Sequence, residues 1–201
     1  MKIGIFIEPK YESLNIIKFW KKIIKKNFKF QKYLDHPPHL TLAFFDFKKK
    51  INTTDLKNLF KNFQFNKIII KILKPSIFYN DPITKADTLH FIVKKKNKLT
   101  NLQKNILIKF IKYRKIIKRN KKLKNRKFII NMKKYGYPFV DNEWLPHFTI
   151  ASIKGGIKKK KIIFDKFLKQ KMSKKLLKIN NFSVWQIKKE KHIKLFKVSL
   201  K

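Results

Sequence analysis

The sequence predicts an α+β fold made of two copies of one structural unit. Strand-like and helix-like segments alternate along the chain, and the same order of segments occurs in both halves. Each half also contains the motif His-apolar-Thr-apolar, at residues 39–42 and 147–150. A chain of 201 residues has the length of one domain. We therefore expect a single domain over 1–201, with a first lobe at about 1–80 and a second lobe at about 88–201.

The first half is predicted to run strand, helix, strand, helix, strand. Alternating or short apolar runs mark the strands, and apolar residues three or four positions apart mark the helices. The prolines of the segment 35–39 force extended backbone, which leads into the second strand. The expected segments are strands at 2–8, 39–45 and 65–73 and helices at 11–27 and 53–60.

The second half repeats this order and ends with two more strands. Its expected segments are strands at 88–94, 147–153, 177–188 and 192–200 and helices at 99–117 and 160–172. An insert at about 113–137 has no counterpart in the first half, and it is the densest basic stretch of the chain. Two interpretations of the insert remain open. It is a solvated extension of a helix, or it grips an RNA backbone through Arg114, Lys118, Arg119, Lys122 and Arg126.

The composition is strongly basic, with 53 Lys or Arg against 11 Asp or Glu and a formal net charge of +42. This charge favours binding to phosphate groups and excludes an acidic, solvating protein. Nearly all the basic residues are lysine in a chain rich in Ile, Asn and Phe, which is typical of an AT-rich genome, so only part of the charge is evidence of function.

The absence of cysteine excludes disulfides and thiolate chemistry. No apolar run suits a signal peptide or a membrane span, so we expect a cytoplasmic, monomeric protein with no membrane partner.

The two motifs carry the chemistry that the sequence offers. Residues two apart in a strand lie on the same face, so the first motif puts His39 beside Thr41. The second motif puts His147 beside Thr149. Two imidazoles can take and deliver protons near neutral pH, because the unperturbed pKa of histidine is about 6.5, and threonine hydroxyls can donate to phosphate oxygens. The motifs therefore favour acid–base chemistry that requires no metal.

On these two motifs the sequence resembles the 2H phosphoesterases, which include RNA 2′,3′-cyclic phosphodiesterases, proteins named for 2′-5′ RNA ligation and 2′-5′ oligoadenylate phosphodiesterases. The resemblance covers nearly the whole chain. It implies two lobes related by a pseudo-twofold axis, each a mainly antiparallel sheet with helices on its outer face, around a central cleft. It assigns catalysis to His39 and His147. It assigns phosphate binding to Thr41 and Thr149, and it implies no cofactor.

The sequence leaves several functions open. The first is metal-independent hydrolysis of a 2′,3′-cyclic phosphate or a 2′-5′ phosphodiester bond, with RNA or a nucleotide as the substrate. The alternatives are an RNA-binding module without catalysis and 2′-5′ ligation of RNA ends, which uses the same residues in reverse. A binding module does not need both histidines and both threonines, so the motifs favour an enzyme.

Four further residues receive interpretations from their local sequence. Tyr137, just before the second motif, is a candidate to stack on an unpaired base. We interpret His36 as a solvated turn residue rather than one that lines the rim of the site. We interpret His90 as a satisfied, half-buried strand residue rather than one that faces the cleft. His192 is expected at the surface, where the last strand begins.

Overall fold

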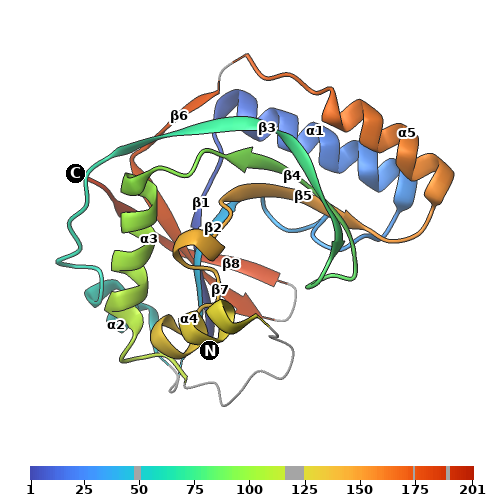
Figure 1. The fold of residues 1–201 in the computed structure, drawn as a ribbon. Coiled ribbons are helices and arrows are strands. Elements are labelled where there is room, and N and C mark those ends of the chain that lie inside the picture. The colour runs from blue at the N-terminus through green and yellow to red at the C-terminus, as the bar shows by residue number, and fades with distance from the viewer. Residues whose placement is uncertain (48–50, 116–124, 174, 189–190) are drawn as a thin grey trace.

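The computed structural model describes residues 1–47, 51–115, 125–173, 175–188 and 191–201. Within these residues, eight strands form one sheet with the order β6-β3-β4-β5-β2-β1-β7-β8. The strands are β1 (Lys2–Ile7), β2 (Leu40–Asp46), β3 (Ile68–Asp81), β4 (Ala86–Val93), β5 (His147–Ile153), β6 (Leu176–Ile179), β7 (Asn181–Lys188) and β8 (Lys191–Ser199). The helices are α1 (Tyr11–Phe28), α2 (Thr53–Asn58), α3 (Asn97–Phe110), α4 (Arg126–Tyr135) and α5 (Ile157–Leu168), with a short 3-10 helix at Asp141–Glu143 (Figure 1).

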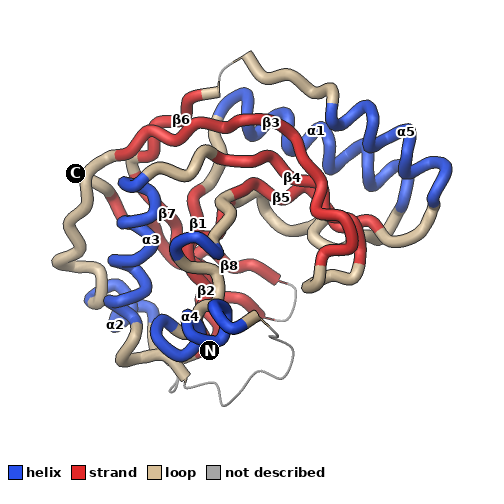
Figure 2. Tube along the Cα trace, in the orientation of Figure 1, coloured by secondary structure: helices blue, strands red, loops and turns tan. Residues whose placement is uncertain are grey.

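The strand order is symmetric about the junction of β5 and β2. On one side lie β4, β3 and β6, and on the other lie β1, β7 and β8. All the neighbouring strands that pair in the described residues are antiparallel, and β6 and β8 form the two edges (Figure 2). The α+β class and the mainly antiparallel, duplicated architecture are therefore confirmed. The two strands that carry the motifs are the ones that meet at the centre.

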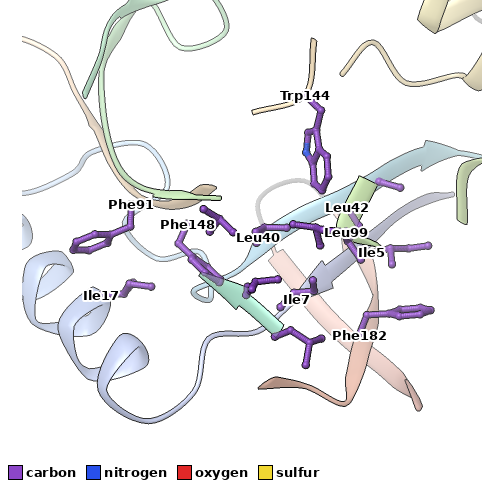
Figure 3. Packing of buried hydrophobic residues seen from close by; sticks show 14 of the residues in the cluster. Ile5, Ile7, Ile17, Leu40, Leu42, Phe91, Leu99, Trp144, Phe148 and Phe182 are labelled. Atoms are coloured by element: carbon purple, nitrogen blue, oxygen red, sulfur yellow. The ribbon is translucent and has the colours of Figure 1, made fainter. Parts of the chain in front are cut away.

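One face of the sheet forms the core. Leu40 of β2 pairs with Phe148 of β5, and both side chains are fully buried (Figure 3). Ile5 and Ile7 of β1 are buried in the same core. Burying a side chain of this size stabilises a fold by about 1.5–3 kcal/mol. The apolar positions of both motifs thus anchor the two central strands from one side.

The helices cross between the two halves of the sheet. α1 follows β1 but packs over β5, and α3 follows β4 but packs over β2. In α1, Ile17, Trp20 and Ile24 recur at helical spacing and are at most 4% exposed. Trp20 packs edge-on against Phe167 of α5, with 5.2 Å between ring centroids, which joins the two helices. No helix in the described part of the chain is both long and apolar enough to cross a membrane.

Three segments differ most from their expected bounds. β3 continues to Asp81 because the strand passes Pro75 with a shift in register, which accommodates a residue that lacks an N–H donor. α3 ends at Phe110, seven residues earlier than expected. The stretch 177–188 is split at Asn180 into β6 and β7, which pair with β3 and β1.

The expected lobe boundaries at about 1–80 and 88–201 do not follow the sheet. β3 pairs with β4 and β6, so it belongs to the half that holds β5. β7 and β8 complete the half that holds β1 and β2. The reason is local, because β3 and β4 are joined by a short turn at 82–85, and strands joined in this way pair with each other. The half that holds β1 and β2 is therefore assembled from both ends of the chain.

Part of the basic insert folds as α4, whose last turn binds Arg114. The Arg114 guanidinium donates to the carbonyl oxygens of Met132 (2.8 Å) and Lys134 (3.4 Å), and also to that of Lys133. The last carbonyls of a helix have no partner within the helix, and they carry partial negative charge. Arg114 thus satisfies the end of α4. These contacts give Arg114 a structural role within the protein, because two of its three guanidinium nitrogens bind the end of α4.

The other basic side chains named for the insert divide into two groups. Arg126 begins α4 and is exposed. Lys118, Arg119 and Lys122 lie within 116–124, which is outside the described residues. A role in RNA binding therefore remains a prediction for these four side chains.

Candidate active site

The two motifs face each other across the junction of β2 and β5. The central apolar residues pair in antiparallel register, so residue numbers run in opposite directions along the two strands. This register sets His39 opposite Thr149. It also sets Thr41 opposite His147. The two motifs therefore meet at this pair, with the histidine of each motif on the side of the threonine of the other.

All four predicted site residues lie on the face of the sheet away from the core. They alternate with motif residues that are 0% exposed, and alternation along a strand sends neighbouring side chains to opposite faces. The four are partly exposed: His39, Thr41, His147 and Thr149. The structure therefore brings together the two histidines and two threonines that the motifs predicted.

The backbone before each motif holds both histidines in the same way. Nδ1 of His39 lies 2.6 Å from the carbonyl oxygen of Pro37. Nδ1 of His147 lies 2.6 Å from the carbonyl oxygen of Leu145. A carbonyl can only accept, so each Nδ1 carries a proton and donates it. Each neutral ring is left with Nε2 as a proton acceptor, which is the form that a general base requires.

Aromatic rings surround His39. Phe6 of β1 lies against it with 4.0 Å between ring centroids, and His192 of β8 lies at 5.6 Å. His36 packs on His192 at 4.2 Å, and Trp185 of β7 lies 6.2 Å from Phe6. We call these five residues the His39 cluster. It is assembled from β1, β7, β8 and the loop before β2.

His147 has a smaller ring cluster on β3 and β4. Phe78 and His90 each lie 5.2 Å from His147, and both approach it edge-on. The rings of Phe78 and His90 stack on each other at 3.7 Å, and His90 is only 1% exposed. We call Phe78, His90 and His147 the His147 cluster. The two clusters together contain all five histidines of the chain.

A buried carboxylate lies behind the His147 cluster. Asp81, at the end of β3, is 8% exposed and accepts hydrogen bonds from Thr88 Oγ1 (2.7 Å) and from the N–H of Ile83 (2.8 Å). Nδ1 of His90 in turn donates to the carbonyl oxygen of Thr88 at 3.1 Å. Thr88 thus connects the carboxylate to the histidine that packs on His147.

A half-buried lysine lies behind the His39 cluster. Lys21 of α1 donates from Nζ to the carbonyl oxygens of Tyr33 (2.5 Å) and Leu34 (3.1 Å), which belong to the loop that carries His36. Burial lowers the pKa of Lys21 to about 8. Its ammonium group remains mostly charged at neutral pH, so it adds positive charge beside the loop.

Burial lowers the pKa of both motif histidines. For His39 the pKa falls to about 3, because burial and the charges of His192, His36 and Lys21 outweigh the hydrogen bond to the Pro37 carbonyl, which raises it. For His147 burial also lowers the pKa, against the hydrogen bond to the Leu145 carbonyl and the charge of Asp81, which raise it. Both rings are therefore neutral at pH 7 without a ligand. A bound phosphate dianion or monoanion favours their protonation, because an opposite charge nearby stabilises the charged form.

The remaining sequence interpretations have different outcomes. Tyr137 packs against Phe139 with 5.6 Å between ring centroids and borders the core, and the phenyl rings beside the histidines come from Phe6 and Phe78 instead. His36 and His192 belong to the His39 cluster, which corrects their interpretation as solvated and surface residues.

The second histidine of the His147 cluster is buried and hydrogen-bonded, as the favoured interpretation of His90 implies, but it also lies on the face of the motifs. His90 alternates with Leu89 and Phe91, which are at most 1% exposed on the core side, so alternation alone places His90 on the face of the motifs. It pairs directly with Thr149 of β5. The contacts of His36 and His192 had no such local signal, because they join a loop to the last strand.

The groups that line the site are imidazoles, hydroxyls and aromatic rings. Among the described residues, no three His, Asp or Glu side chains converge closely enough to hold a metal ion. The arrangement can remove a proton at one Nε2, deliver a proton at the other and donate hydrogen bonds from two hydroxyls to an anion between them. These are the requirements of acid–base catalysis at a phosphodiester.

Comparison with known proteins identifies the fold. No protein-family model and no curated protein matches the sequence. Solved structures match nearly the whole chain. The protein TT0787 of Thermus thermophilus is 13% identical with a TM-score of 0.60, and the match covers 99% of this chain and 97% of that one. LigT of E. coli, complexed with 3′-AMP, is 13% identical with a TM-score of 0.59 and the same coverage. A phosphoesterase is 11% identical with a TM-score of 0.54, again over 99% and 97% of the two chains.

Likeness at these identities establishes the architecture. The chain has the fold of LigT over its full described length. The fold that the resemblance to the 2H phosphoesterases implies is therefore confirmed.

Proposed function

We propose that this chain, which has the fold of LigT, is a metal-independent phosphodiesterase that uses His39 and His147. Its substrate bond is a 2′,3′-cyclic phosphate or a 2′-5′ phosphodiester in RNA or in a nucleotide. The observation that carries the proposal is the meeting of the two motifs, which sets each histidine opposite a threonine of the other strand. Two unrelated strand histidines would have no reason to share this arrangement.

The proposed reaction needs two proton transfers. One Nε2 removes a proton from the oxygen that attacks phosphorus, while the second imidazole, protonated at Nε2, delivers a proton to the oxygen that leaves. Thr41 and Thr149 donate hydrogen bonds to the non-bridging oxygens, where negative charge accumulates in the transition state. The Nδ1 bonds to Pro37 and Leu145 keep both Nε2 atoms correctly presented throughout.

The nucleotide complex of the structural neighbour supports this substrate class. LigT was solved with 3′-AMP. Opening a 2′,3′-cyclic phosphate leaves the phosphate on the 2′ or the 3′ oxygen, so a nucleoside 3′-phosphate is one of the two possible products. The net charge of +42 also favours an anionic substrate.

The net charge supports one alternative as well, an RNA-binding module without catalysis. Ligation of RNA ends is the other, because it runs the same proton transfers in reverse. Neither alternative explains the paired motifs better than hydrolysis does.

A substrate panel tests the proposal. The purified protein is incubated with nucleoside 2′,3′-cyclic phosphates, with 2′-5′-linked and 3′-5′-linked oligonucleotides and with oligonucleotides ending in a cyclic phosphate. Products are then measured by mass. Hydrolysis adds one water to a cyclic phosphate or yields two fragments from a 2′-5′ linkage, and the 3′-5′ linkage stays intact. Longer products would indicate ligation, and binding without any product would indicate the non-catalytic module.

A further inference from the structure

A β-bulge follows the threonine of the first motif. Thr41 and Ala43 of β2 pair with successive residues of β1, so Leu42 between them is an extra residue. Leu42 and Ala43 are both 0% exposed, which shows that the alternation of faces is interrupted at this point. A bulge bends its strand and redirects the side chains beside it. The side chain beside this bulge is that of Thr41.

The second motif has the same bulge. Thr149 and Ala151 of β5 pair with successive residues of β4, so Ile150 is the extra residue. Ile150 and Ala151 are also both 0% exposed. The two bulges occupy equivalent positions of the duplicated motif, directly after its threonine. Bulges next to a site aim its side chains, so these two belong to the geometry that presents the threonine hydroxyls.

Gln103 of α3 holds the first bulge. Its Nε2 donates to the carbonyl oxygen of Leu42 at 3.0 Å and to that of Phe139 at 3.0 Å, and Gln103 itself is 0% exposed. The extra residue of a bulge is unpaired in the ladder, so a buried side chain that donates to its carbonyl oxygen fixes its position. In the described part of the chain, no side chain donates to the carbonyl oxygen of Ile150. The two bulges therefore differ in their support.

The same amide links the two segments that carry the motifs. Phe139 lies in the stretch that leads to β5, whereas β2 and β5 themselves pair, among the described residues, only at Leu40 and Phe148. Gln103 thus adds a second connection between β2 and the chain that leads to the second motif. Its Oε1 is buried without a hydrogen-bond partner among these residues. A buried amide is costly unless it is bonded, so what Gln103 contributes is its donors.

We infer that Gln103 is a positioning residue for Thr41. Its amide fixes the bulge at Leu42, and the bulge sets the direction of the Thr41 hydroxyl towards the phosphate. This inference rests on the proposed function, in which Thr41 donates to a non-bridging oxygen. It adds a residue of a helix, outside both motifs, to the site. It also makes the two threonines unequal, because no described side chain holds the bulge beside Thr149 in this way.

Loss of the Gln103 donors should act on the rate through the backbone. The Leu42 carbonyl belongs to the residue next to Thr41, so a carbonyl that turns towards another donor also moves Thr41. A displacement of about 1 Å in a positioned group can cost about 10²-fold in rate. Removing a hydrogen-bond donor to a transition-state oxygen costs about 10²–10³-fold. The effect of Gln103 on the rate is therefore at most that of Thr41→Ala.

A double-mutant cycle on turnover of the best substrate of the panel tests the inference. Gln103→Leu keeps most of the side-chain volume and removes both donors, and we expect it to lower kcat by about 10–100-fold with little change in KM. In a Thr41→Ala background the same substitution should lower kcat by less than about 2-fold further, because the hydroxyl that Gln103 positions is absent. In a Thr149→Ala background it should cost its full factor, because Gln103 does not hold the second bulge.

Asn131→Leu is the matched control. Asn131 of α4 donates to the carbonyl oxygens of Pro138 (3.0 Å) and Val140 (3.3 Å), which flank Phe139, and these hydrogen bonds do not reach β2. Its kcat should stay close to that of the wild type. An equal loss of kcat in Asn131→Leu, or an equal loss from Gln103→Leu in all three backgrounds, would overturn the inference, because the substitution would then act through the fold as a whole.

Backbone amide chemical shifts test the same link without turnover. In Gln103→Leu the shifts of residues 41–43 should move, whereas those of residues 149–151 should stay close to the wild-type values. Unmoved shifts at 41–43 would overturn the inference. Gln103→Met, which also lacks a donor, is the second variant if the leucine variant does not fold. A wild-type protein that is inactive on every substrate of the panel would instead refute the proposed function, and the shifts would still decide whether Gln103 holds the bulge.

Discussion

The ring of Phe6 lies against the ring of His39, with 4.0 Å between their centroids, and it also covers the backbone of Gly4 two residues earlier. A Cβ atom at position 4 would lie 2.2 Å from Cζ of Phe6. Glycine is therefore required there because the ring approaches so closely. The Phe6 ring that flanks His39 therefore depends on the absence of a side chain at Gly4.

Gly4→Ala should displace Phe6 and lower both stability and turnover. Overpacking of this kind costs about 1–3 kcal/mol, measured as the free energy of unfolding in a denaturant titration. The double variant Gly4→Ala/Phe6→Leu is the control, because a smaller side chain at position 6 removes the clash. If the alanine costs as much in the Phe6→Leu background as in the wild type, the contact between Gly4 and Phe6 is not the cause.

Stability should fall as the pH falls from about 6.5 towards 4. Burial lowers the pKa of His36 and of His90 to about 4 and that of His39 to about 3, while each is about 6.5 in the unfolded chain. The unfolded chain therefore binds more protons in this window, so the stabilising contribution is complete above pH 6.5 and is lost below it.

Chemical denaturation at pH 7 and pH 5 measures this effect. His90→Phe removes one titrating group from a site that is 1% exposed, so its unfolding free energy should drop less between the two pH values than that of the wild type. An equal drop in both proteins would show that His90 is not held neutral in the fold.

Arg114→Met should destabilise the protein by about 1–2 kcal/mol, because it removes the side chain that donates to the carbonyl oxygens of Lys133 and Lys134 at the end of α4. Arg126→Met is the matched control, since Arg126 is exposed and should stay within about 0.5 kcal/mol of the wild type. Thermal unfolding of the two variants separates the effects. Equal stability of both variants would contradict the capping role of Arg114.

The site could be predicted from sequence only to the extent that its signals are local. Alternation within each motif places His39 beside Thr41 and buries Leu40, because strand geometry repeats every two residues. The same rule identifies the face of His90. The pairing of Leu40 with Phe148 could not be predicted in this way, because it joins segments that are far apart in the chain.

The assembly of the sheet shows the same limit. The short turn between β3 and β4 carries Pro82, and a short turn predicts that the two strands pair. This local signal assigns β3 to the same half as β4, although the expected boundary at about residue 80 placed the two strands in different lobes. The pairing of β7 with β1 could not be predicted from local sequence, because the two strands lie near opposite ends of the chain. The contact of Arg114 with α4 depends on the path of the insert, which composition alone does not reveal.

Activity should survive an excess of chelator. The proposed mechanism moves protons between imidazoles and oxygens and uses no metal-activated water. Turnover of the preferred substrate is measured before and after incubation with EDTA and dialysis. Loss of turnover that a divalent ion restores would overturn the metal-independent mechanism.

The central claim is that His39 and His147 together perform the chemistry. Its most direct test is steady-state turnover of the best substrate from the panel by His39→Ala and His147→Ala, with folding verified by circular dichroism. We predict that each variant lowers kcat by about 10²–10⁴-fold while KM changes little, because the rings move protons in the transition state and contribute less to ground-state binding. Near wild-type kcat in either variant would contradict the account.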